Sequence, residues 1–234
     1  MPAFETVVFD LDGTLLDTLD DLHLSTNAAL AAHDMPARTL DEVRRFVGNG
    51  IALLIHRAVP EGTPADVEAA VLADFRRHYG AHCEDHTGPY PGIPELLAHL
   101  RAAGVRVAVV SNKADFAVQE LVARQFPNTF DAVLGECEER GVRKKPAPDM
   151  VEAALKRMGA AAGAPGQSGP SPADRATLAY VGDSEVDVAT AANVGCACVG
   201  CAWGFRGRES LLASGATVVV DTPAELERVL LAGK

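Results

Sequence analysis

Two aspartates, Asp10 and Asp12, stand two residues apart in the string FDLDGTLLDT, directly after an apolar run. In an extended chain, residues two apart point to the same side, so both carboxylates can address one space. Gly13 follows them and allows the chain to turn sharply. An aspartate at a strand end also begins many ordinary turns, so the pair alone fits a structural role as well. The full string FDLDGTLLDT, at the end of a predicted strand, favours a chemical role in which the two carboxylates act together.

Two more strings place polar groups at the ends of predicted elements. Ser111 closes the run VRVAVVS and is followed by Asn112. The serine hydroxyl and the amides after it can hold an oxyanion, although either residue can instead cap the next helix. Lys145 precedes a proline, which favours an extended backbone and lets the ammonium be aimed inward. These residues are therefore candidates for binding an anionic group.

A third carboxylate, that of Asp183, ends the run LAYVGD, and Asp187 lies four residues later, about one helical turn away. Three carboxylates near one point repel one another unless a cation lies among them. Hard oxygen ligands without clustered histidines or thiolates favour Mg²⁺. Such a metal keeps a nucleophile ionised and neutralises charge on a phosphoryl group. The set therefore fits nucleophilic attack by a carboxylate on phosphorus.

The elements that must position these groups alternate between strand and helix. Continuous apolar runs, as expected for strands covered on both faces, occupy residues 6–10, 105–111, 131–135, 178–183, 196–200 and 217–221. Helical patterns lie at residues 93–104, 114–126 and 148–159. This alternation predicts an α/β fold with a doubly wound, Rossmann-like parallel sheet. Active groups then gather at the carboxyl ends of the strands.

One stretch breaks the alternation, because residues 17–86 show only helical periodicity. We expect a helical cap at residues 17–87, inserted after the first strand into a core of residues 1–16 and 88–234. Hinges are expected near residues 15–18 and 86–92. Residues 159–176 are rich in Gly, Ala, Pro and Ser, which predicts an exposed loop without a function of its own.

Composition limits the classes of function. With 48% hydrophobic and 23% charged residues, the 234-residue chain is predicted to be globular rather than disordered. A net charge of −11 argues against nucleic acid as a partner, although a local basic site can still bind a phosphate. No apolar run approaches the roughly 20 residues of a membrane span, and the N-terminus is unlike a signal peptide. Five cysteines in such a chain indicate reduced thiols and a cytoplasmic location.

In these motifs the chain resembles the haloacid dehalogenase superfamily, in the branch with a helical cap after the first strand. DLDGT, the serine of VAVVS, the lysine of KKP and GDSEVD match its four motifs in order, and the resemblance covers essentially the whole chain. It implies that Asp10 attacks phosphorus and that Asp12 serves as general acid and then general base. It also implies a phosphoryl site at Ser111 and Lys145.

The resemblance further implies the ligands of Mg²⁺. These are Asp10, Asp183 and the backbone carbonyl of Asp12, with Asp187 placed behind them. Thr14 and Asn112 are expected beside the substrate.

The predicted cap carries the question of substrate. Its segment RRFVGNGIALLIHRAV is similar to that of phosphoglycolate phosphatases, which it matches at Arg44, Phe46, Gly48, Asn49, Gly50 and Arg57. We expect Asn49 at the substrate, and Arg44 or Arg45 could clamp a small carboxylate or lie on the surface. Residues 203–205 (Trp-Gly-Phe) resemble the same group.

The function predicted first is Mg²⁺-dependent hydrolysis of a small phosphorylated metabolite, with 2-phosphoglycolate as the best guess, through an aspartyl-phosphate. A sugar phosphomutase of the β-phosphoglucomutase kind, a pyrophosphatase and a non-catalytic phosphometabolite sensor remain alternatives. Dehalogenases lack the aspartate at position 12. Phosphonate cleavage needs a lysine in the cap, whereas the first lysine here is Lys113. Both a monomer and a homodimer remain open.

Two further clusters are better explained by structure than by chemistry. His78, His82 and His86 recur every four residues and could bind Zn²⁺ on a helix, but Gly80 is expected to fray that helix. Cys196, Cys198 and Cys201 form C-x-C-x₂-C without a fourth ligand nearby, and we expect small core residues.

Overall fold

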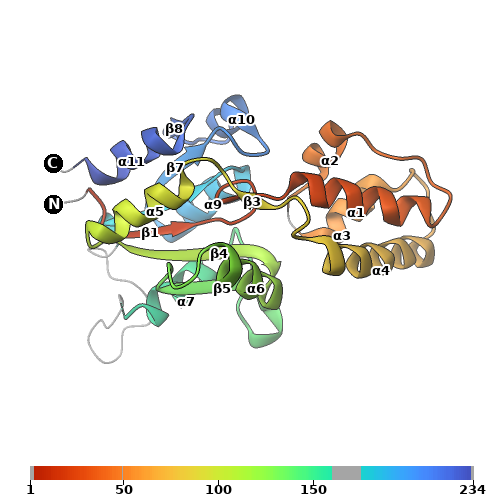
Figure 1. The fold of residues 1–234 in the computed structure, drawn as a ribbon, viewed down its shortest axis with the longest axis horizontal. Coiled ribbons are helices and arrows are strands. Elements are labelled where there is room, and N and C mark those ends of the chain that lie inside the picture. Colours follow the sequence, from red (N-terminus) through yellow and green to blue (C-terminus); the bar gives the residue numbers. More distant parts are fainter. Residues whose placement is uncertain (1–2, 49, 160–174, 233–234) are drawn as a thin grey trace. The chain divides into compact units, whose positions relative to one another are not determined.

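The computed structural model describes residues 3–48, 50–159 and 175–232. Most of the loop predicted at residues 159–176, and Asn49 of the predicted substrate site, lie outside these residues. The strands are β1 (Thr6–Phe9), β2 (Leu16–Asp17), β3 (Gly88–Pro89), β4 (Arg106–Ala114), β5 (Ala132–Glu136), β6 (Leu178–Gly182), β7 (Ala197–Cys201) and β8 (Val218–Val220). The helices are α1 (Leu19–Ala31), α2 (Leu40–Phe46), α3 (Ile51–Ala58), α4 (Ala65–His82), α5 (Ile93–Ala102), α6 (Asp115–Gln125), the 3₁₀ turn η1 (Glu138–Arg140), α7 (Asp149–Arg157), α9 (Glu185–Val194), α10 (Gly207–Ala213) and α11 (Pro223–Leu231) (Figure 1).

The chain divides into two compact units. A sheet unit comprises Met1–Leu15 and Pro89–Lys234, and a helical unit comprises Leu16–Gly88. In the sheet unit, six strands pair in the order β5-β4-β1-β6-β7-β8, and each of the described pairings is parallel. The prediction of an α/β, doubly wound, Rossmann-like sheet is confirmed.

The valine-rich runs form these strands because both faces of the sheet are covered. On one face, Val8, Val110 and Tyr180 pack with Met150 of α7 and Val194 of α9 in a single buried cluster. Alternate residues point to the opposite face, as strand geometry requires. The helices α5 and α11 contact each other, and α5 also contacts β4 (Figure 1). The sheet is thereby a buried scaffold whose strand ends are held in register.

One predicted boundary is wrong. The strand expected to end at Ser111 continues as β4 to Ala114, and Ala114 is the N-cap residue of α6. Neither Ser111 nor Asn112 is the N-cap residue of α6, so both side chains make other contacts at the end of the sheet.

The helical unit holds α1 to α4, with the short pair β2 and β3 at its ends. Asp21 of α1 is buried, and its carboxylate accepts hydrogen bonds from the backbone N–H of His86 and from both the backbone and the hydroxyl of Thr87, at 2.7–3.1 Å. A carboxylate with several donors stabilises a turn strongly, because each bond is charge-assisted. Asp21 therefore fastens the start of the unit to its end.

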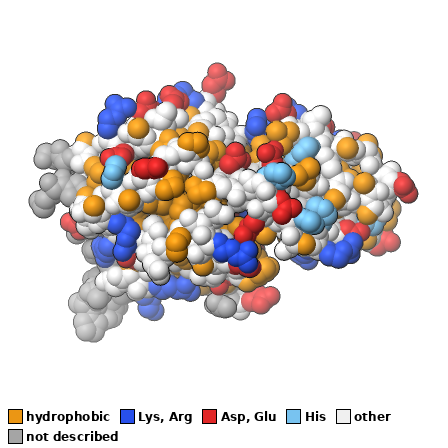
Figure 2. Space-filling view, viewed as in Figure 1, with side chains coloured by type: hydrophobic (Ala, Val, Ile, Leu, Met, Phe, Trp, Pro, Cys, Tyr) orange, Lys and Arg blue, Asp and Glu red, His pale blue; other side chains and the backbone are white. Residues whose placement is uncertain are grey.

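The helix fraying expected at Gly80 is wrong, because α4 continues through Gly80 to His82. Its histidines have other partners: His78 bonds Ser25, His82 bonds Asp85, and the two imidazole rings lie 4.4 Å apart. Histidine side chains are visible on the surface of this unit (Figure 2). Within the part of the chain that is described, no helix has both the length and the apolar character for crossing a membrane.

Candidate active site

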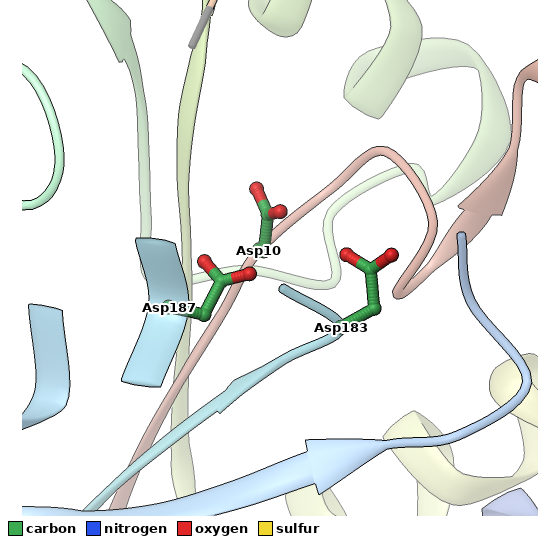
Figure 3. Close-up of side chains that lie close together, drawn as sticks. All are labelled: Asp10, Asp183 and Asp187. Carbon is green, nitrogen blue, oxygen red and sulfur yellow. The ribbon is translucent and has the colours of Figure 1, made fainter. Parts of the chain in front are cut away.

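Two aspartates meet at the carboxyl ends of neighbouring strands. The strands β1 and β6 pair in parallel from Thr6 to Phe9, and the N–H of Asp10 donates to the Val181 carbonyl at 2.9 Å. Asp10 and Asp183 therefore leave the sheet side by side. Together with Asp187 of α9 they offer carboxylate oxygens within 4.8 Å of one another, and all three residues are buried (Figure 3). Among the described residues, no other group of this kind could hold a metal ion.

Lys145 joins this group. Its Nζ lies 2.7 Å from Oδ1 of Asp10 and 2.8 Å from Oδ1 of Asp187, and the side chain is almost completely buried. Asn112 holds the backbone that carries it: the amide of Asn112 donates to the Lys145 carbonyl at 3.0 Å and accepts from the Lys145 N–H at 2.8 Å. The structure thus places Asn112 on the Lys145 main chain.

Asp187 has little capacity left for a further ligand. Its Oδ1 accepts from Lys145 and from the hydroxyl of buried Tyr180 at 3.2 Å. Its Oδ2 accepts from the backbone and the hydroxyl of Ser184, at 3.1 and 2.6 Å, as part of the capping box that begins α9. With these donors in place, Asp187 orients Lys145 towards Asp10.

The charges in this group do not balance. Three carboxylates and one ammonium leave two negative charges if all are ionised. Burial, together with the carboxylates of Asp187 and Asp12, raises the pKa of Asp10 to about 7 despite the nearby ammonium. Burial and the neighbouring aspartates likewise raise the pKa of Asp183 well above its ordinary value. For Lys145, burial alone would lower the pKa, but the carboxylates of Asp10 and Asp187 outweigh it and raise that pKa well above normal.

Asp183 is fixed by the segment after β7. The N–H of Phe205 donates to Oδ2 of Asp183 at 2.7 Å, and the indole N–H of Trp203 donates to the Thr14 carbonyl at 3.1 Å. Gly204, which stands between Trp203 and Phe205 in the sequence, lies very close to Asp183. A Cβ added at Gly204 would stand 2.3 Å from the Asp183 Cβ. The Thr14 hydroxyl also points to Asp183, at 3.5 Å from Oδ1. Residues 203–205 and Thr14 therefore hold a carboxylate in place.

The turn after β1 carries Asp12, which pairs with Lys113. Gly13 has a φ of +83°, which other residues rarely adopt, so the sharp turn expected there is present. Oδ1 of Asp12 accepts from the ammonium of Lys113 at 2.8 Å. Ser111 is buried at the end of β4, and its hydroxyl accepts from the Lys113 N–H at 3.2 Å.

Two of the candidate residues of the helical unit, Arg44 and Arg57, have partners within that unit. Arg44 lies 3.1 Å from Asp41, and Arg45 is exposed. Arg57 donates to the Phe46 carbonyl at 2.9 Å. The hydrogen bond from Arg57 therefore connects α3 to the last residue of α2.

Sequence reasoning missed two residues of the site. Tyr180 stands three positions before Asp183, inside an apolar run where a tyrosine is read as core. A hydroxyl on such a buried strand needs a partner, which was the available signal. Lys113 follows Ser111 and Asn112, and its signal was a cation directly beyond a strand end that carries other polar groups.

The three neighbouring cysteines carry no comparable chemistry. Cys201 is buried, and Cys196 and Cys198 pack against the core cluster. Burial raises the pKa of Cys196 to about 11 and that of Cys198 to about 12. The thiols are therefore weakly ionised, as expected for core residues.

Comparisons with known proteins agree on one family. Residues 4–195 match the model of the haloacid dehalogenase-like hydrolases. A phosphoglycolate phosphatase of Cereibacter sphaeroides is 34% identical over 81% of this chain and 81% of its own length. The phosphoglycolate phosphatase of Vibrio parahaemolyticus is 31% identical over 96% and 95%.

Solved structures point the same way. A protein from Lactobacillus delbrueckii subsp. bulgaricus, assigned as a phosphoglycolate phosphatase, superimposes with a TM-score of 0.87 at 36% identity and covers 99% of this chain and 100% of its own. A predicted phosphoglycolate phosphatase from Haemophilus somnus gives 0.83 at 28% identity, over 98% and 99%. The prediction from the motifs is confirmed: the chain is a hydrolase of the haloacid dehalogenase-like family, similar to its phosphoglycolate phosphatases.

Proposed function

We propose that the protein is a Mg²⁺-dependent phosphatase of a small phosphorylated metabolite, with 2-phosphoglycolate as its substrate. The observation that carries this proposal is the buried group of Asp10 and Asp183, at the ends of β1 and β6, with Asp187 of α9; Lys145 pairs with Asp10 and Asp187. The names of the similar proteins support the choice of phosphoglycolate. The helical unit is proposed to act as the cap.

The residues present fit a divalent cation. Asp10 and Asp183 supply hard oxygen ligands, and the two uncompensated negative charges match the charge of Mg²⁺. Burial, and after it the neighbouring carboxylates, raise the pKa values of both carboxyl groups, so a cation bound between them would favour their ionised forms. With the backbone carbonyl of Asp12 as a third ligand, bound Mg²⁺ would supply charge neutralisation at the phosphoryl oxygens.

The chain's own groups then perform the transfer. Asp10 attacks phosphorus with one carboxylate oxygen, and the ester bond breaks as an aspartyl-phosphate forms. Asp12 gives its proton to the leaving oxygen and afterwards takes a proton from the water that hydrolyses the intermediate. Lys145 and Ser111 hold the phosphoryl oxygens as charge develops on them. Buried Lys145 is already positioned for this by Asn112 and Asp187.

The proposal is tested by replacing the nucleophile. Asp10→Asn should abolish phosphate release from 2-phosphoglycolate while the thermal unfolding transition remains cooperative. The matched control is Asp221→Asn, which changes an exposed aspartate just after β8 that pairs with Arg208. It should keep full activity. Phosphate release by Asp10→Asn at the wild-type rate would contradict the mechanism.

The substrate and the metal need separate measurements. A screen of phosphorylated metabolites should give the highest kcat/KM for 2-phosphoglycolate. Chelation with EDTA should stop turnover, and added Mg²⁺ should restore it. Transfer of the phosphoryl group within a hexose phosphate, without release of phosphate, would identify a mutase instead.

A further inference from the structure

Lys113 makes an ion pair that the motif chemistry does not require. Its ammonium donates to Oδ1 of Asp12 at 2.8 Å, and the two side chains are only 10% and 18% exposed. A pair so shielded from water is held more firmly than a surface salt bridge, since little solvent competes for either charge. The geometry therefore distinguishes this contact from the exposed ion pairs of the chain.

The two residues come from neighbouring strands of the sheet. The strands β1 and β4 pair in parallel, with Phe9 opposite Val109. Because β4 continues to Ala114, Lys113 extends past the sheet edge at the level of the turn that carries Asp12. Its backbone is also fixed, as its N–H donates to the Ser111 hydroxyl at 3.2 Å. The scaffold thus presents the ammonium to Asp12 and leaves Oδ2 of that carboxylate for another partner.

We propose that Lys113 is a positioning residue for Asp12, which it holds by Oδ1 so that Oδ2 exchanges the proton in both half-reactions. This inference rests on the proposed function. In the first half, the bond from Asp10 to phosphorus forms, the ester P–O bond breaks with its electron pair on the leaving oxygen, and Asp12 Oδ2 gives that oxygen its proton. The charge left on Asp12 is stabilised by Lys113. In the second half, water bonds to phosphorus, its proton passes to Oδ2, and the bond between phosphorus and Asp10 breaks with its electron pair on Asp10, which releases phosphate.

The test exploits the need of the leaving group for a proton. An alkoxide leaves poorly unless it is protonated, whereas p-nitrophenolate leaves without help. Lys113→Met keeps an unbranched side chain that is one atom shorter, and it removes the charge and the donors. We expect this variant, in the presence of Mg²⁺, to lower kcat/KM for ethyl phosphate about 100-fold and that for p-nitrophenyl phosphate by no more than about threefold. Neither ester carries a carboxylate, so recognition of phosphoglycolate does not enter the comparison.

A second comparison, of kcat with kcat/KM, tests the role of Lys113 in the hydrolysis of the intermediate. The ratio kcat/KM for p-nitrophenyl phosphate reports steps up to the first transfer, whereas kcat includes attack by water. Lys113→Met should therefore lower kcat and KM for this ester together. Lys113→Arg, which keeps a charged donor, should recover ethyl phosphate activity to within about tenfold of the wild type. Lys156→Met, a change of an exposed lysine in the last turn of α7, serves as the control and should match the wild type.

The possible results distinguish failure of the role proposed for Lys113 from failure of the proposed function. An equal loss for both esters in Lys113→Met would overturn the positioning role, as would full ethyl phosphate activity in that variant. Retained activity towards p-nitrophenyl phosphate shows that the variant has folded. If the wild-type enzyme releases no phosphate from 2-phosphoglycolate, or the Asp10→Asn variant releases it equally fast, the proposed function fails, and the inference fails with it.

Discussion

A methyl group at position 204 should disturb the site more than its small size suggests. Gly204 has no side chain, and a Cβ added there would stand 2.3 Å from the Cβ of Asp183 and 2.4 Å from the Gly13 carbonyl oxygen. Ordinary contacts of a Cβ begin near 3.4 Å. The variant Gly204→Ala must therefore move Asp183 or the segment around residue 204 by about 1 Å.

The size of the effect follows from this displacement. Mg²⁺ demands near-ideal geometry with ligand distances of about 2.0–2.1 Å, so a carboxylate shifted by about 1 Å no longer fits. A misplacement of that size at a catalytic site can cost about 100-fold in rate. We expect kcat/KM to fall about 100-fold in Gly204→Ala and the Mg²⁺ concentration for half-maximal activity to rise. Overpacking should lower the free energy of unfolding by about 1–3 kcal/mol.

The control is a glycine of the same sheet unit whose neighbours can yield. At Gly200 of β7, the atoms nearest to an added Cβ would belong to side chains, with Leu211 Cδ1 at 3.1 Å and Val219 Cγ2 at 3.4 Å. Gly200→Ala should lower the unfolding free energy by about 1 kcal/mol and leave kcat/KM within about threefold of the wild type. Activity titrated against Mg²⁺ and urea unfolding check both variants. A folded Gly204→Ala enzyme with wild-type kcat/KM and Mg²⁺ dependence would refute the role assigned to this glycine.

Two further predictions concern buried Tyr180 and two half-buried cysteines of the sheet unit. Tyr180→Phe removes the hydroxyl that donates to Asp187, and we expect urea unfolding to show a loss of about 1.5–3 kcal/mol, the usual contribution of a hydrogen bond to a charged group. An unchanged unfolding free energy would contradict that contribution. Because burial raises the pKa of Cys196 to about 11 and that of Cys198 to about 12, their thiolates are scarce at pH 8, and iodoacetamide should label them far more slowly in the native protein than in urea. Equal labelling rates followed by peptide mass spectrometry would show that these thiols are accessible and ionised.

The parts of the structure that sequence reasoning predicted are those set by local pattern. The apolar runs that became β1 and β6 carry continuous hydrophobic residues, which is typical of strands covered on both faces. Parallel strands end at one edge, so placing Asp10 and Asp183 near each other required only the order of the elements. The family could also be predicted from the sequence, because each of its four motifs is a short local string.

The parts that it missed depend on contacts between distant segments. That Asn112 holds the Lys145 backbone could not be read from either string, because the two residues are 33 positions apart and each has several plausible partners. The same is true of Tyr180, whose hydroxyl is satisfied by Asp187 of the following helix. The fraying of α4 expected at Gly80 was wrong because that expectation considered only the low helix propensity of glycine. The stacked rings of Phe75 and Tyr79 stabilise the helix that Gly80 alone would weaken.

The most direct measurement asks where the phosphoryl group goes during turnover. The enzyme with Mg²⁺ is mixed with excess 2-phosphoglycolate, quenched in acid within a single turnover and digested for mass spectrometry. A hydroxylamine-sensitive phosphoryl group on Asp10, absent from Asp10→Asn, is the expected result. A phosphoryl group on another residue would contradict the carboxylate nucleophile.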